Sequence, residues 1–173
     1  EGEVWTSKKV FESLNKEREK MGEELYANPR NLAAGTIRQL DPKIVSERKL
    51  QNFTYDISMA NFPMPETQFD ELLKLEKLGF KVNKHRRLCK NIEEVIFYWK
   101  EWQKKAGKED YWIDGVVVKV DSRKYQELLG YTGKAPRWGI AFKFRAEQAT
   151  TILEDIKIQV GRTGVLTPVA YLR

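Results

Sequence analysis

The sequence predicts an α+β fold, in which helices and strands are mixed without strict alternation along the chain. Two runs rich in β-branched and aromatic residues, 112–120 and 139–145, predict the clearest strands. Other segments repeat apolar residues at helical spacing and begin with residues that favour helix starts. Of the 173 residues, 41% are hydrophobic and 32% are charged, which is the composition of a folded globular chain.

Most of the predicted helices follow a side chain that can accept hydrogen bonds from the first helical turn. Ser7 precedes a helix over about 8–21, and Asn28 with Pro29 precedes a second helix from Arg30 to Leu40. Asp41-Pro42 is expected to end that second helix, because a residue before proline avoids the helical region. Further helices are expected between Thr67 and Gly79, between Asn91 and Gly107, and over 123–129.

The predicted strands lie between these helices and after them. In chain order they are Glu3–Trp5, 52–58, 112–120, 139–145 and short strands from 151 onward. Glycines interrupt the last group, which suggests that a new β unit begins there. The first residue is Glu1 and the first strand follows at once, so we expect the chain to be cut from a longer polypeptide.

The chain is basic, with a net charge of +6 and a pI near 9.3. A basic surface attracts phosphate polyanions, although many basic proteins bind no nucleic acid. A single cysteine, Cys89, and a single histidine, His85, exclude a four-ligand zinc site within the chain. No apolar run approaches the roughly 20 residues that cross a bilayer. We therefore expect no membrane partner and a cytoplasmic setting.

Lys119 is the first candidate site residue, because it lies in a strand between Val118 and Val120. Strand alternation places Lys119 on one face with Val117, and Asp114 on the other face with Val118. An unpaired ammonium among apolar neighbours is costly, so Lys119 needs a partner such as a phosphate or a purine nitrogen. The alternative is a buried strand with charged residues at its ends, which explains Asp114 well and Lys119 less well.

Lys143 lies between Phe142 and Phe144 on the next predicted strand. A lysine on a rigid element can hold its charge in fixed geometry against a phosphate. Taken alone, this segment is better explained as an ordinary half-exposed strand.

Arg30 and Arg38 lie in the segment 27–41. An arginine in the first turn opposes the helix dipole, and an anion bound at that helix end would resolve the conflict. Arg38 is eight residues further along, so the two could contact different parts of one extended anion. Solvated surface arginines are the alternative.

These segments together resemble the ordered motifs of the NAD-dependent DNA ligases of bacteria. The matching segments are Glu1–Val4, 26–41, Asp114–Val120, Pro136–Phe144, and 159–170 with its Gly161-Arg162-Thr163-Gly164. The resemblance implies a partial covalent nucleotidyltransferase fold, the ATP-grasp-like adenylation fold of ligases, with mixed and antiparallel sheets and flanking helices. It places the C-terminal part of that domain at 1–148 and the first strands of an OB-fold β-barrel at 149–173.

The resemblance also implies the activity. Such ligases transfer AMP from NAD to their own lysine, then to the 5′-phosphate of a nick, and the 3′-hydroxyl displaces it. The implied partners are nicked double-stranded DNA and NAD or AMP, with Mg²⁺ or Mn²⁺ as metal and zinc only in domains outside this chain. The implied setting is DNA replication and repair by a monomer in the bacterial cytoplasm, associated with the nucleoid.

Site residues follow from the motif matches. Glu3 would bind the adenylate ribose, Tyr55 would stack on adenine, and Lys119 would contact the base edge. Lys143 would hold the AMP phosphate, while Arg30 and Arg38 would position phosphates of cofactor or nick. Asp114 would have a supporting or metal-linked role, and Arg162 would approach the DNA backbone. Tyr55 also has a simpler interpretation as a core aromatic residue.

The chain departs from the family pattern in one decisive place. No Lys-x-Asp-Gly, the motif of the nucleophilic lysine, occurs in it. A family arginine is also replaced at Ala106, with Lys104, Lys105 and Lys108 nearby, and lysine lacks the bidentate fork of arginine. The isolated chain is therefore expected to be inactive. Two alternatives stay open: an ATP-dependent ligase or capping enzyme, and a basic DNA-binding module acting through patches such as 84–87.

Overall fold

The computed structural model describes residues 1–145 and 149–173. Helices and short strands alternate irregularly along the chain, as the α+β prediction requires. The helices are α1 (Lys8–Lys20), α2 (Pro29–Ile37), α3 (Pro42–Glu47), α4 (Gln68–Lys77), α5 (Ile92–Lys105) and α6 (Arg123–Leu129), with a 3-10 turn η1 at Ala106–Lys108. The strands are β1 (Gly2–Trp5), β2 (Gln51–Thr54), β3 (Gly115–Lys119), β4 (Gly139–Lys143), β5 (Leu153–Val160) and β6 (Leu166–Leu172).

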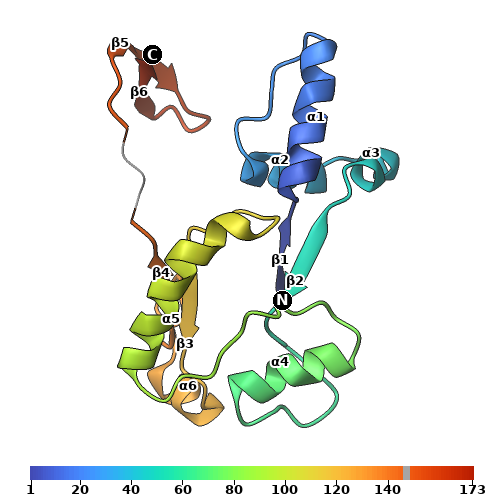
Figure 1. Ribbon diagram of the computed structural model, residues 1–173, viewed down its shortest axis with the longest axis vertical. Coiled ribbons are helices and arrows are strands. Elements are labelled where there is room, and N and C mark those ends of the chain that lie inside the picture. The colour runs from blue at the N-terminus through green and yellow to red at the C-terminus, as the bar shows by residue number, and fades with distance from the viewer. Residues whose placement is uncertain (146–148) are drawn as a thin grey trace.

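In the described part of the chain the strands form three separate antiparallel ribbons, β1–β2, β3–β4 and β5–β6. Figure 1 shows α1, α2 and α3 gathered at one end of the β1–β2 ribbon, whereas α5 lies along the β3–β4 ribbon. The most deeply buried apolar side chains are few and belong to three helices: Leu32 and Ala33 of α2, Leu75 of α4 and Trp102 of α5.

The predicted helix starts are confirmed by side-chain hydrogen bonds. Ser7, Asn28, Thr67 and Asn91 each accept a bond from a backbone N–H in the first turn of the following helix. One helix was not predicted. Asp41-Pro42 follows the end of α2, but Asp41 also caps the new helix α3, with Pro42 at its first position. Asp41 accepts from the Lys43 N–H at 2.8 Å, so Asp41-Pro42 begins a helix a few residues after α2 has ended.

Several predicted elements are shorter than expected. The helix expected to reach Leu40 ends at Ile37, and the strands expected over 52–58 and 139–145 end at Thr54 and Lys143. The strand expected over 112–120 covers only Gly115–Lys119. β2 pairs with β1 over four residues, with Gly2 opposite Thr54 and Trp5 opposite Gln51. Tyr55 consequently lies one residue beyond β2 rather than within a strand. The expected domain boundary after residue 148 falls at 146–148, outside the described residues.

Candidate functional site

The register of the β3–β4 ribbon places Lys119 and Lys143 on the same face. Gly115 is opposite Lys143, and Lys119 is opposite Gly139. Cross-strand partners and residues two apart share a face, so both ammonium groups project from one side of the ribbon. Their backbones are separated by the length of four strand residues, about 13 Å. A single ligand contacted by both lysines must therefore be extended.

Lys119 is held between two aromatic rings. Its Nζ lies 5.0 Å from the centre of the Tyr55 ring and 5.5 Å from that of Trp138, both within cation–π range. The same Nζ donates to the Tyr55 carbonyl at 3.5 Å. Burial lowers the pKa of Lys119, and the negative charges of Asp56, Glu71 and Glu1 oppose that shift. Within the described residues no carboxylate forms an ion pair with Lys119, so the aromatic rings and a carbonyl are its partners.

Tyr55, the residue after β2, connects the β1–β2 ribbon to Lys119 through the contact between its ring and the ammonium. Its side chain is 39% exposed, so part of the ring remains open to a ligand. Burial raises the pKa of the Tyr55 phenol, with further contributions from Glu1, Glu3 and Asp56. The phenol therefore stays neutral at physiological pH, and its ring can stack on a heterocycle without carrying charge.

Lys143 forms an ion pair with Asp114, with 2.5 Å between Nζ and Oδ2. The side chains of Lys143 and Asp114 are 60% and 82% exposed, and exposed pairs contribute little to stability. An incoming anion can therefore replace Asp114 at small energetic cost. The pairing also corrects the strand-parity expectation, because Asp114 precedes β3 and reaches the lysine face.

The opposite face of the β3–β4 ribbon packs on α5. Trp99 stacks on Phe142 with ring centres 4.7 Å apart, and its indole N–H donates to the Lys143 carbonyl at 3.2 Å. Gly115 allows β3 to approach β4 closely, because a Cβ there would lie 2.6 Å from the Phe142 carbonyl oxygen. These contacts fix the backbone from which Lys143 projects.

Glu3 and Arg30, which are both predicted site residues, line one small pocket of ≈ 180 Å³ between β1 and α2. Its other lining residues are Val4, Ala33, Ala34 and Ile37. Arg38 does not line it: Arg38 is the exposed residue that ends α2. Arg162 lies further away in sequence, exposed in the turn between β5 and β6.

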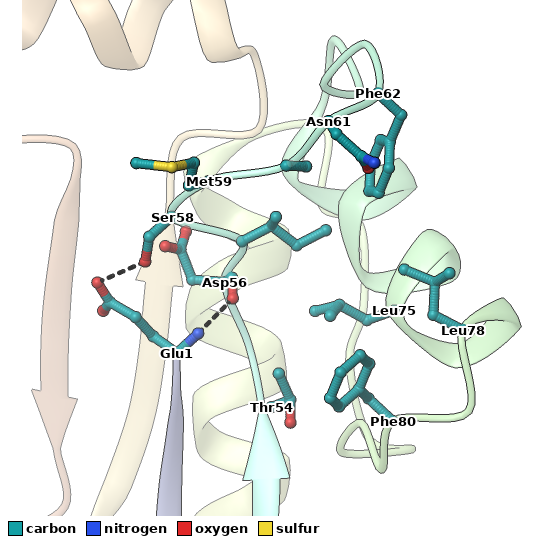
Figure 2. Close-up of a pocket in the computed structure, with 12 residues that line it drawn as sticks. Glu1, Thr54, Asp56, Ser58, Met59, Asn61, Phe62, Leu75, Leu78 and Phe80 are labelled. Atoms are coloured by element: carbon teal, nitrogen blue, oxygen red, sulfur yellow. Dashed lines mark hydrogen bonds between the residues drawn. The ribbon is translucent and has the colours of Figure 1, made fainter.

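A larger cavity of ≈ 770 Å³ was not indicated by the sequence (Figure 2). The segment 56–62 lines one side, and Leu75, Leu78 and Phe80 line the other. Glu1 lies at one end, where its backbone nitrogen donates to the Asp56 carbonyl and its carboxylate accepts from the Ser58 hydroxyl. The walls are largely apolar, and none of the described residues that line them is a lysine or arginine. This cavity therefore does not suit a phosphate-bearing ligand.

Several residues around the Tyr55–Lys119 contact were missed by sequence reasoning. They are Trp138, the buried glutamines Gln68 and Gln126, and the ion pair of Glu71 with Arg123. Trp138 lies within the matching segment Pro136–Phe144, so the motif could have identified it as a site residue. The other four are polar residues in helices, and nothing in their local pattern distinguishes them from surface residues.

The described residues contain no group of three or more histidine, cysteine, aspartate or glutamate side chains that could hold a metal ion. Asp114 is a single carboxylate at the lysine face. No helix in the part of the chain that the structure describes is long and apolar enough to cross a membrane.

Comparison with known proteins gives a consistent match. The family model described as NAD-dependent DNA ligase adenylation domain matches residues 1–147. DNA ligases of Thermotoga maritima and Thermotoga neapolitana are 56% and 54% identical to the chain over 171 residues, and that of Shouchella clausii is 51% identical over 171 residues. These matches cover 99% of this chain and 25%, 25% and 26% of the relatives, so the chain spans about a quarter of their length.

Proposed function

The chain belongs to the family of NAD-dependent DNA ligase adenylation domains, and on that premise we propose that it forms part of the nucleotide site of a DNA ligase. The reaction proposed is the sealing of single-strand nicks between a 3′-hydroxyl and a 5′-phosphate, through enzyme–AMP and DNA–adenylate intermediates. Its setting would be bacterial DNA replication and repair. The observation that carries the proposal is the common face of Lys119 and Lys143, with Tyr55 packed against Lys119.

An adenylate fits this face as an extended ligand with an aromatic end and an anionic end. We assign the Tyr55 ring to stacking on adenine and Lys119 to the base edge. Lys143 would release Asp114 and bind the AMP phosphate. Transfer between phosphates depends mainly on positioning and on neutralising charge, which fixed cations supply.

The remaining assignments concern the ribose and the further phosphates. Glu3 would accept a hydrogen bond from the ribose, and Arg30, beside it in the same pocket, would bind a phosphate of NAD or of the nick. Arg38 at the end of α2 would act on the same phosphates, and Arg162 in the β5–β6 turn would contact the DNA backbone.

Mg²⁺ fits the site only if most of its ligands come from the phosphates of the substrate. Magnesium is usually bound through one or two carboxylates together with phosphates and water. Asp114 is the carboxylate available at the lysine face, and it would support such an ion while the phosphates supply further ligands. We assign no zinc to this chain.

We further propose that 149–173 begins an OB-fold domain after the adenylation domain at 1–148. The antiparallel β5–β6 hairpin supports this division, since an OB barrel is built from such strands. The whole ligase is proposed to act as a cytoplasmic monomer on nicked duplex DNA.

The alternative of a basic DNA-binding module rests on patches such as 84–87. Both arginines of that patch are paired: Arg86 contacts Glu76 at 2.6 Å, and Arg87 lies 3.7 Å from Glu101. Charges already neutralised by carboxylates attract DNA weakly. This pairing favours the nucleotide site over the patch as the main functional feature.

The proposal predicts the nucleotide that the full-length protein uses. Nick sealing with Mg²⁺ is expected with NAD and not with ATP, because the match is to the NAD-dependent family. The assay compares the sealing of a labelled nicked duplex in the presence of NAD with its sealing in the presence of ATP. Sealing with ATP alone would assign the chain to the ATP-dependent class instead.

A second prediction concerns the 173-residue chain by itself. We expect no covalent AMP adduct after incubation with NAD and Mg²⁺, because Lys-x-Asp-Gly is absent and Lys119 and Lys143 are assigned as charged partners. An ammonium that neutralises a phosphate is protonated and cannot attack it. Intact mass spectrometry checks the result. A gain of one adenylate that disappears when a single lysine is replaced would show that the nucleophile lies within this chain.

A further inference from the structure

Two glutamines on different helices form a buried bridge beside the Tyr55–Lys119 contact. Gln68 begins α4 and Gln126 lies in α6, and each side chain is 7% exposed. The Gln126 amide N–H donates to the Gln68 amide oxygen at 3.3 Å. Buried amides are costly unless they are bonded, so the partners of this pair determine its structural role.

The two ends of the bridge are backbone carbonyls of the site. Gln126 also donates to the Val120 carbonyl at 2.6 Å, and Gln68 donates to the Tyr55 carbonyl at 3.2 Å. Carbonyl oxygens only accept hydrogen bonds, so each Nε2 must point to its carbonyl. The orientation of both amides is thereby fixed by their surroundings.

The bridge joins two ribbons that share no strand pairing in the described part of the chain. Tyr55 directly follows β2, and Val120 directly follows Lys119 at the end of β3. The Tyr55 carbonyl accepts from both the Gln68 amide and the Lys119 ammonium. The bridge therefore holds the two groups assigned to adenine at a set separation.

Other bonds tie α4 to the turn after β3 but do not extend to Tyr55. The Gln68 N–H donates to the Asp121 carbonyl at 2.7 Å, and the Phe69 N–H donates to the Asp121 carboxylate at 2.9 Å. These bonds fix the backbone from which Gln68 projects. From this fixed backbone, the Gln68 side chain forms its hydrogen bond to the Tyr55 carbonyl at the end of β2.

We propose that Gln126 and Gln68 are positioning residues that set the gap between the Tyr55 ring and the Lys119 ammonium, and so determine affinity for the adenine of NAD. The inference rests on the proposed function of this face. Adenine must be stacked and contacted at its edge at the same time, and misplacement of either group by about 1 Å can weaken the interaction severely. Both glutamines are buried, so neither is assigned a contact with the nucleotide.

The test uses the full-length ligase with Gln68→Met, Gln126→Met and the double variant. Methionine keeps the length of the side chain and removes its hydrogen bonds. Each variant is expected to raise KM for NAD in self-adenylation about ten-fold, the effect of losing one hydrogen bond. The rate at saturating NAD is expected to change much less. Because both residues serve one bridge, the double variant should resemble the single variants rather than multiply their effects.

Gln103→Met is the matched control, since Gln103 is exposed on α5 and should leave KM unchanged. Unchanged KM in folded Gln68→Met and Gln126→Met proteins, with only a lower melting temperature, would overturn the inference. If Gln68→Met does not fold, Gln68→Asn is used instead, because its side chain is one methylene shorter. An unchanged KM for NAD in the folded Gln68→Asn protein would then overturn the inference. A normal self-adenylation rate in Lys119→Ala would instead refute the proposed site itself.

Discussion

Replacing Lys143 by alanine in the full-length ligase is expected to slow self-adenylation about 100-fold or more, the usual effect of removing one fixed charge contact to a reacting group. Lys143 projects from a backbone held by Trp99, and its exposed pair with Asp114 is easily exchanged for a phosphate. Lys119→Ala is expected to have a comparable effect, because Lys119 shares the face and is the cation next to Tyr55.

Formation of the AMP adduct over time, followed by intact mass, measures this loss. Lys100→Ala is the matched control, since it removes the same charge from an exposed position on α5. Circular dichroism establishes that each variant is folded. Adenylation of Lys143→Ala at the wild-type rate would contradict this role and show that Lys143 is an ordinary half-exposed strand residue.

Replacing Arg123 by methionine is expected to be the most destabilising of the substitutions considered. Glu71 is 1% exposed, and its carboxylate accepts from Arg123 at 2.5 Å and from the Ile57 N–H at 2.5 Å. Removing the arginine leaves a buried carboxylate with one donor, which costs about 3–5 kcal/mol. The result should be opening of the α4–α6 region next to Tyr55.

Hydrogen exchange in the full-length protein measures that opening region by region. Peptides covering α4 and α6 should exchange about 100-fold faster or more, the factor that 3 kcal/mol corresponds to. Arg87→Met is the control, because its partner Glu101 is at 3.7 Å and such surface pairs contribute little. Glu71→Gln added to Arg123→Met should restore part of the protection, since a neutral amide is less costly to bury. Unchanged exchange in Arg123→Met would show that the pair does not hold these helices.

Much of the local structure could be predicted from the sequence, because caps and strands are encoded by nearby residues. Asn28-Pro29 and Thr67 specify helix starts through bonds only three residues long. The ends of elements were less predictable. The helix expected to reach Leu40 ends at Ile37, and Asp41 caps a further helix, α3, that was not predicted.

The candidate site could be predicted in its residues but not in its geometry. The motif resemblance supplied Tyr55, Lys119 and Lys143 as separate positions. Their common face depends on the register of β3 against β4, which no single segment contains. The Gln68–Gln126 bridge joins residues 58 apart in sequence, so only the folded chain reveals it. The cavity in Figure 2 likewise arises from packing of α4 against the segment 56–62.

Adenine is proposed to stack on the Tyr55 ring with its edge at Lys119, which Trp138 also contacts. The most direct test of this claim is photolabelling of the full-length ligase with NAD that carries an azide on the adenine ring, followed by peptide mapping. The expected label lies in the peptides that contain Tyr55, Lys119 or Trp138, and excess unmodified NAD should suppress it. Labelling confined to the segment 57–62 and to Leu75, Leu78 and Phe80, which line the apolar cavity, would contradict the claim.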